Sequence, residues 1–369
     1  MRYIYYIFLP IILLMSGCAG HSAIPGPEFD IQDGSYIFFD AEVIRTKGTL
    51  ISGTTLPSEV ENSRFGVFGT RPDGSHIFDM YAAAPNDRQM SSAFNNVAVM
   101  YRQEAGGVFH YDALALWMAG EHDFYAYYPY DYPKGAVISN LILTARPYLQ
   151  YTQPVGLDDM VDVMTAAALN KKATDTDAQP VKFTFHHRLF AFDVILSNLQ
   201  SESARNLRIS HAEVKFLNVC SGANLYFDDG NDTDTYADVT LGTGKHDAIV
   251  HTYELPDGLV LDAPAEGETS VDHNLNEASS FLFAPCAELQ VEFTMTFLNA
   301  WNEESTFELS RTISPSETEG FLPGKRYALM VNKKDNGEEI EFEASLKAFV
   351  YDGNGNYWES SPDINIEFN

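Results

Sequence analysis

The segment Arg45-Thr46-Lys47 is a basic site at which a trypsin-like protease could hydrolyse the backbone. One residue, Ile44, separates it from SYIFFDAEV (35–43), in which apolar residues alternate with Phe38, Asp40 and Glu42. Such an alternation is typical of a β-strand with one buried face. Cleavage after Arg45 would start the chain at Thr46 and cut this strand from the rest; the alternative is an ordinary arginine in an exposed loop. The apolar positions of the removable strand are Ile37, Phe39, Ala41 and Val43.

Two other arginines, Arg64 and Arg71, offer alternative cleavage sites. They flank the residues FGVFGT, which together with Arg64 form an apolar segment (64–70) that we expect to be a core strand. A cut at either arginine would remove or disrupt that strand, so Arg45 is the favoured site.

Cys18 is a second residue with distinctive chemistry, because its thiol could be lipidated. A positive start and an apolar run from Ile4 to Met15 precede it, which is the pattern of a secretory signal. The run is too short for a membrane-spanning helix, which needs about 20 residues. LMSGC (14–18) resembles the lipobox of bacterial lipoproteins, with Met15 in place of the usual leucine. We expect residues 1–17 to be the signal peptide; the alternative is an ordinary cleaved signal followed by a chance cysteine.

Neither a catalytic motif nor a metal-binding motif is found, and we predict no enzyme, no metal site and no cofactor. HExxH and G-x-S-x-G are absent. His186-His187 are neighbours on an expected strand and would point to opposite faces, so they cannot easily share one ion. The acidic loop DDGNDTDTYAD (228–238) could hold calcium, but it lacks the EF-hand spacing. The two interpretations of this loop are a solvated loop and a calcium site.

The aromatic segment HDFYAYYPYDYP (122–133) could form a platform on which sugar rings stack. On a strand, Tyr125 and Tyr127 share one face while Tyr128 takes the other. The glycan-contact candidates are therefore Tyr125 and Tyr127. The alternative is that these rings fill the core of a β-rich protein.

The composition indicates a large β-rich protein with an acidic surface. The 369 residues are 45% hydrophobic and 13% aromatic, and the net charge is −29. Such a charge argues against nucleic acid and anionic membranes as partners, because both require a basic surface. Beyond Cys18 the chain has only Cys220 and Cys286, which could pair or stay as free thiols.

The length predicts two domains of ordinary size. The polar run NKKATDTDAQP (170–180) is the expected boundary, and VKFTFHHRLFAFDVILSNL (181–199) is expected to open the second domain. We therefore divide the chain into a tether with the removable strand (18–45), an N-terminal β-sandwich (46–175) and a C-terminal β-sandwich (176–369). The best candidate for a helix is VDVMTAAALNKK (161–172), and many short strands with regular turns indicate antiparallel sandwiches.

The segment SPDINIEFN (361–369) has the alternation that a donated strand requires. Ile364, Ile366 and Phe368 form one apolar face, between Asn365, Glu367 and Asn369. Such a strand could add to the sheet of another molecule. The alternative is that it completes the second sandwich of its own chain.

Several of these segments, in this order, together resemble the fimbrillin family, the major- and minor-fimbria-like pilins of Bacteroidetes. The most distinctive part extends from DVMTA to FTFHHRL (162–189). The other matching segments are the lipobox at Cys18, IRTKG (44–48), RFGVFG (64–69), the stretch from Trp117 into HDFYAYYPY (122–130), FLFAP (281–285), FLPGKRYALMV (321–331) and the late Trp358.

The resemblance implies two transthyretin-like antiparallel β-sandwich domains in tandem. It also implies export as an outer-membrane lipoprotein exposed at the surface, removal of the first strand by an Arg-specific protease, and growth of a fimbria as each emptied groove takes a strand from a neighbouring pilin subunit. The partners would be other pilin subunits, the protease and a host glycan or protein receptor. The resemblance does not distinguish a stalk, a tip and an anchor.

The predicted function is therefore a structural fimbrial subunit that serves adhesion. A monomeric surface lipoprotein that binds host or dietary glycan through Tyr125 and Tyr127 is the alternative. An acidic glycosidase is a third hypothesis, because such enzymes need only two carboxylates at a suitable separation, which a sequence does not show.

Overall fold

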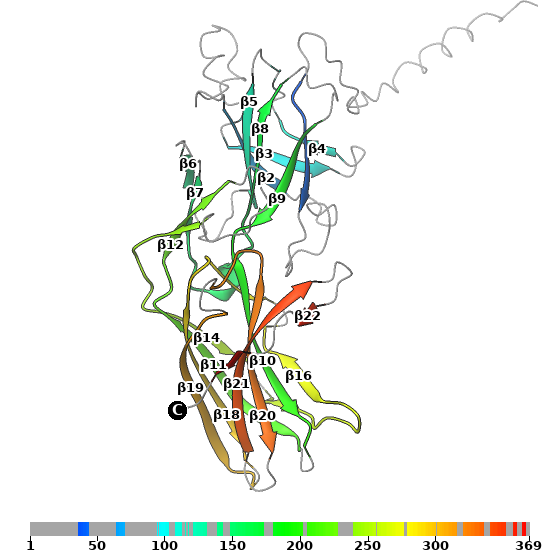
Figure 1. Cartoon of the computed structure of the whole chain (residues 1–369), viewed down its shortest axis with the longest axis vertical. Coiled ribbons are helices and arrows are strands. Elements are labelled where there is room, and N and C mark those ends of the chain that lie inside the picture. Colours follow the sequence, from blue (N-terminus) through cyan, green and yellow to red (C-terminus); the bar gives the residue numbers. More distant parts are fainter. Residues whose placement is uncertain are drawn as a thin grey trace, which may run out of the picture.

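The computed structural model shows a chain built of strands (Figure 1). It describes residues 36–43, 64–70, 94, 96–102, 108–112, 115, 117, 121–130, 139–142, 148–172, 180–201, 205–227, 239–255, 257–276, 279–299, 301–315, 320–335, 340–351, 357–359 and 364–366. Within these ranges the regular elements are strands and one short 3₁₀ helix, η4 (Leu157–Asp159), so the all-β class is confirmed. In the same ranges, no helix has the length and apolar character needed to cross a membrane.

The upper unit in Figure 1 is a seven-stranded sheet with the order β1-β9-β8-β5-β2-β3-β4. Its strands are β1 (Phe39–Val43), β2 (Arg64–Thr70), β3 (Val97–Arg102), β4 (Val108–His110), β5 (His122–Tyr128), β8 (Met164–Lys171) and β9 (Val181–His187). Neighbours are antiparallel except β1 and β9, which are parallel. Because β1 and β4 also contact each other, the sheet curls around its core.

A small sheet with the order β13-β12-β7-β6 packs against part of the outer face of this first sheet. Its strands are β6 (Ser139–Ile142), β7 (Tyr148–Thr152), β12 (Gly222–Tyr226) and β13 (Val239–Leu241). Leu149 of β7 and Phe227, just after β12, pack against Phe68, Tyr125 and Tyr127 of the first sheet. The first sheet therefore contacts apolar side chains on both faces.

The lower unit is formed by two sheets around one hydrophobic core. The order of the first is β16-β10-β20-β21-β22, with β17 on β10 and β23 on β21; the second is β14-β11-β18-β19, with β15 on β11. The first contains β10 (Phe190–Leu199), β16 (Ser270–Asn274), β17 (Phe281–Phe283), β20 (Arg326–Asp335), β21 (Ile340–Tyr351), β22 (Tyr357–Glu359) and β23 (Ile364–Ile366). The second contains β11 (Leu207–Leu217), β14 (Ala248–Tyr253), β15 (Leu259–Leu261), β18 (Leu289–Leu298) and β19 (Glu304–Ile313).

The expectation that residues 181–199 open the second unit is wrong for their first half. β9 belongs to the first sheet, where it lies between β1 and β8, and only β10 enters the lower unit. The polar run 170–180 therefore joins two adjacent antiparallel strands of one sheet. Composition alone does not separate such a connection from an interdomain linker, because both are polar and rich in turn residues.

The helical candidate at 161–172 is also a strand, β8. Its alanines have high helix propensity, but alternate residues serve opposite faces of the sheet. Met164, Ala166 and Ala168 lie in the inner core, whereas Ala167 and Leu169 contact the outer cluster. Burial on two faces decided the outcome over local propensity.

The connection from β9 to β10 is fixed by buried polar groups. Arg188 is fully buried; its backbone N–H donates to the carbonyl of Val163 at 2.8 Å, and its Nε donates to Thr165 Oγ1 at 2.5 Å. His187 Nδ1 lies 2.7 Å from Asp162 Oδ2. These contacts hold the end of β9 against the residues that lead into β8.

Candidate functional site

The most informative site is the groove occupied by β1, the strand expected to be removable. β1 pairs in parallel with β9, with Phe39 opposite Val181 and Ala41 opposite Phe183. The N–H of Val181 donates to the carbonyl of Phe38 at 2.8 Å. The strand is thus part of the sheet and is not an outlying segment.

The other side of the β1 segment is held at Ile37, just before the strand begins. Its N–H donates to the carbonyl of Ala115 at 2.8 Å, and its carbonyl accepts a hydrogen bond of 2.6 Å from the Tyr111 hydroxyl. The same hydroxyl accepts the N–H of Ala115 at 3.1 Å. We call Tyr111 and Ala115 the clasp. Sequence reasoning missed it, because a tyrosine in GGVFHYDALALWMAG (106–120) carries no signal that distinguishes this contact from ordinary packing.

The apolar face of the β1 segment points into the core of the upper unit. The alternation predicted this burial, and the exposed fraction is at most 3% for Ile37, Phe39 and Ala41. The removal of the strand stays a prediction. The Phe39 ring lies among four aromatic rings. Its centroid is 5.4 Å from that of Phe94, 5.6 Å from Tyr111, 5.6 Å from Phe124 and 5.5 Å from Phe183. Val43 continues the register opposite Phe185.

The remaining predicted residues of the assembly mechanism divide into two groups. Ile364 and Ile366 lie in β23, opposite Leu346 and Ala344 of β21 in the same chain. This pairing is the arrangement that completes the second sandwich internally. Cys18, Arg45, Thr46 and Phe368 lie outside the described residues, and so does the acidic loop 228–238.

Tyr125 and Tyr127, the candidates for glycan contact, are packing residues in this fold. They are 8% and 2% exposed, and they lie in the outer cluster with Phe68, Leu149 and Phe227. Burial, with a smaller effect of Asp123, raises the pKa of Tyr125 to about 12. The two tyrosines do share one face, as expected, but the small sheet covers that face, so they present no ring to a sugar.

Gly66 of β2 provides a test of this packing. A Cβ there would overlap the Tyr127 ring and lie 2.9 Å from Asn96 Oδ1, the acceptor of a 2.6 Å hydrogen bond from the Tyr127 hydroxyl. We expect Gly66→Ala to lower the free energy of unfolding by about 1–3 kcal/mol, because the ring must move and lose this bond. Urea denaturation measures the loss. In a Tyr127→Ala background the cost should largely vanish; an undiminished cost would show that the ring is not its cause.

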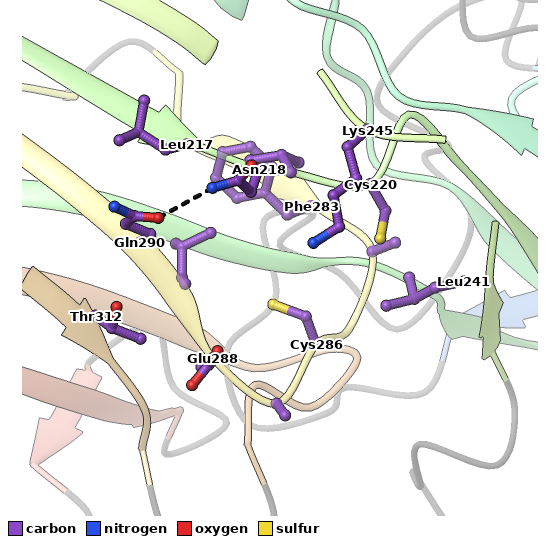
Figure 2. A pocket seen from close by; sticks show the side chains of 14 residues that line it. Leu217, Asn218, Cys220, Leu241, Lys245, Phe283, Cys286, Glu288, Gln290 and Thr312 are labelled. Atoms are coloured by element: carbon purple, nitrogen blue, oxygen red, sulfur yellow. Dashed lines mark hydrogen bonds between the residues drawn. The ribbon is translucent and has the colours of Figure 1, made fainter. Parts of the chain in front are cut away.

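A separate pocket of about 290 Å³ lies beside the turn after β11 in the lower unit (Figure 2). Cys220 and Cys286 both line it, and both are free thiols. Figure 2 shows the two sulfurs turned into the pocket from separate segments, near Lys245 and Glu288. The pKa of the Cys286 thiol is raised to about 12, mainly by burial. Such a thiol is a poor nucleophile at physiological pH.

We expect iodoacetamide at about pH 8 to alkylate Cys286 at least about 100-fold more slowly in the folded protein than in urea, because only the thiolate reacts. Peptide mass spectrometry after timed quenching gives the rate at this one residue. Equal rates in the folded and unfolded states would contradict the raised pKa of this thiol.

The part of the chain that the structure describes holds no group of three histidine, cysteine or acidic side chains placed to bind a metal ion. His186 and His187 are both buried, and His187 is engaged with Asp162.

A profile of the fimbrillin-like family matches residues 61–347. The chain belongs to the fimbrillin-like family. Both β1 and β23 lie outside the matched residues, so the family match covers the walls of the groove but neither the strand that fills it nor the predicted donor strand. No curated protein matches this chain.

Of three similar solved structures, the first shares the fold of this chain. A fimbrial protein from Bacteroides vulgatus is 13% identical with a TM-score of 0.52, and the alignment covers 85% of this fimbrillin-like chain and 99% of that protein. A putative cell adhesion protein from Bacteroides uniformis is 17% identical over 85% of this chain and 98% of its own, with a TM-score of 0.44. A fimbrial anchor protein from Porphyromonas gingivalis is 10% identical over 88% of this chain and 99% of its own, with a TM-score of 0.33.

Proposed function

We propose that this chain is a structural subunit of a surface fimbria that serves adhesion, and that it assembles by strand exchange after cleavage at Arg45. Membership of the fimbrillin-like family supports the pilin-like structural role. The proposal includes export as a lipoprotein anchored at Cys18 in the outer membrane. Its partners are other pilin subunits, an Arg-specific protease and a host receptor, with no nucleic acid.

The observation that carries the proposal is the position of β1. The strand ends at Val43, two residues before Arg45, and pairs with β9, which is far away in sequence. After a cut at Arg45 only non-covalent contacts would hold it. Burial of Ile37 and Phe39 contributes roughly 1.5–3 kcal/mol each, so a released strand would still resist leaving.

Loss of β1 would create a strong binding site for another strand. The groove would expose the backbone groups of β9 and the apolar walls of the core, and both are unfavourable in water. A strand from a second molecule restores the hydrogen bonds and the burial together. β23 is a suitable donor, because within the described residues its pairing with β21 extends over three positions, so few backbone hydrogen bonds there would be lost when it leaves.

The test uses the full chain without its signal peptide and an Arg-specific protease at low dose. Mass spectrometry should find the first stable product beginning at Thr46, and light scattering should then detect growing oligomers. Arg45→Lys is the matched control, since it keeps the charge but should resist this protease and stay monomeric. Cleavage at Thr46 without any assembly, or a first stable cut at another residue, would refute the proposal.

A further inference from the structure

We propose that the groove selects its incoming strand by an aromatic side chain at the position of Phe39 and a large aliphatic side chain two residues earlier, and that Ile366 and Phe368 of a second copy supply this pair. The inference rests on the proposed function and adds to it the partner's recognition pattern, register and direction.

The position of Phe39 is the most selective part of the groove. Four aromatic rings surround it with centroid distances of 5.4–5.6 Å, in edge-on, tilted and stacked orientations. Aromatic pairs in such geometries gain attraction beyond the burial of their area. Because the Phe39 side chain is 3% exposed, the space has a closed aromatic lining. A smaller side chain there would leave a cavity.

The clasp fixes the register of the strand relative to this space. Tyr111 and Ala115 bind the carbonyl and the N–H of Ile37, two residues before the aromatic position. Both contacts are to backbone atoms, so a different strand can make them. The Ile37 side chain is fully buried, so a large apolar residue is required in the same place.

The position of Ala41 sets the direction. Its side chain is 2% exposed and has only the volume of a methyl group. A strand that runs as β1 does can place Ile366 at position 37 and Phe368 at position 39, with Glu367 between them. If Phe368 entered in the opposite direction, Ile366 would fall on the position of Ala41. Inserting the extra carbons there would overpack the core.

The experiment measures how peptides displace a fluorescent β1 peptide (residues 35–43) from the full chain cut by the Arg-specific protease. Residues 361–369 should compete, and Phe368→Ala in this peptide should weaken competition at least about 100-fold. Glu367→Ala, on the outward face, should change it less than about threefold. A peptide of reversed sequence should compete far less well. Tyr111→Phe in the protein should weaken the binding of every peptide by about fivefold, because the hydrogen bond to the strand's carbonyl is lost.

The outcomes separate this inference from the proposed function. If the native peptide and its Phe368→Ala variant compete equally, or the reversed peptide matches the native one, the recognition pattern is wrong while strand exchange stands. If the β1 peptide binds but residues 361–369 do not, a second copy's strand is not the partner. If no peptide enters the cut chain, the proposed function itself fails.

Discussion

Replacing Phe39 by alanine should lower the free energy of unfolding by about 3–5 kcal/mol, among the largest effects of any single truncation in the upper unit. The ring fills the space between Phe94, Tyr111, Phe124 and Phe183, so its removal loses burial and leaves a cavity. The residues around it belong to several strands of one core, which limits how far they can collapse into the gap. Urea denaturation measures the change, and hydrogen exchange at β9 reports whether β1 is loosened.

Two variants make this result specific to the ring. Phe39→Leu keeps part of the volume and should cost clearly less than the alanine variant. Asp40→Asn alters the neighbouring exposed side chain, and it should stay within about 0.5 kcal/mol of the parent. A loss below about 1 kcal/mol for Phe39→Ala would mean that β1 contributes little to the core. The emptied groove would then have little affinity for a replacement strand.

Replacing Arg326 by methionine should cost a similar amount, about 3–5 kcal/mol near neutral pH. Asp193 is fully buried; its Oδ2 accepts a hydrogen bond of 2.6 Å from Nε of Arg326 and forms an ion pair with Nη2 at 2.5 Å. Without the guanidinium a carboxylate stays in the interior of the lower unit with its main counter-charge removed. Such a group is far more costly than either the intact pair or an apolar replacement of both partners.

The pH dependence of this variant follows from the carboxyl group. Burial, the largest cause, raises the pKa of Asp193 above its ordinary value, and Arg326 opposes that rise. Between the ordinary pKa and the folded pKa, the folded state holds a proton that the unfolded state releases, so stability falls as pH rises through that range. Removing Arg326 raises the folded pKa further. The deficit of Arg326→Met should accordingly be smaller at about pH 5 than at about pH 7.

Denaturation of both proteins at the two pH values tests this sign. Lys334→Met is the matched control, because Lys334 is a cation on the same strand, β20, but its ion pair with Glu343 lies at the surface. It should cost no more than about 1 kcal/mol. A deficit of Arg326→Met that grows on acidification would contradict the assignment to a buried Asp193 carboxylate.

Within a strand, the pattern of residue types is enough to show which side chains face the interior. The alternation around Phe39 predicted a buried face, and the alternation around Tyr125 and Tyr127 correctly placed both rings on one side of β5. The order of segments along the chain also predicted the family that the profile match shows. These are local properties, because successive side chains of a strand point to opposite faces whatever the strand pairs with.

The partners of those faces are visible only in the folded chain. It placed β9 beside β1, turned the alanine-rich segment 161–172 into a strand and covered the tyrosines with the small sheet. It also brought Tyr111 to the backbone of Ile37, a contact 74 residues apart. Alternation gives no information about which distant segment lies opposite, because pairing depends on how all the apolar faces of the chain are buried together.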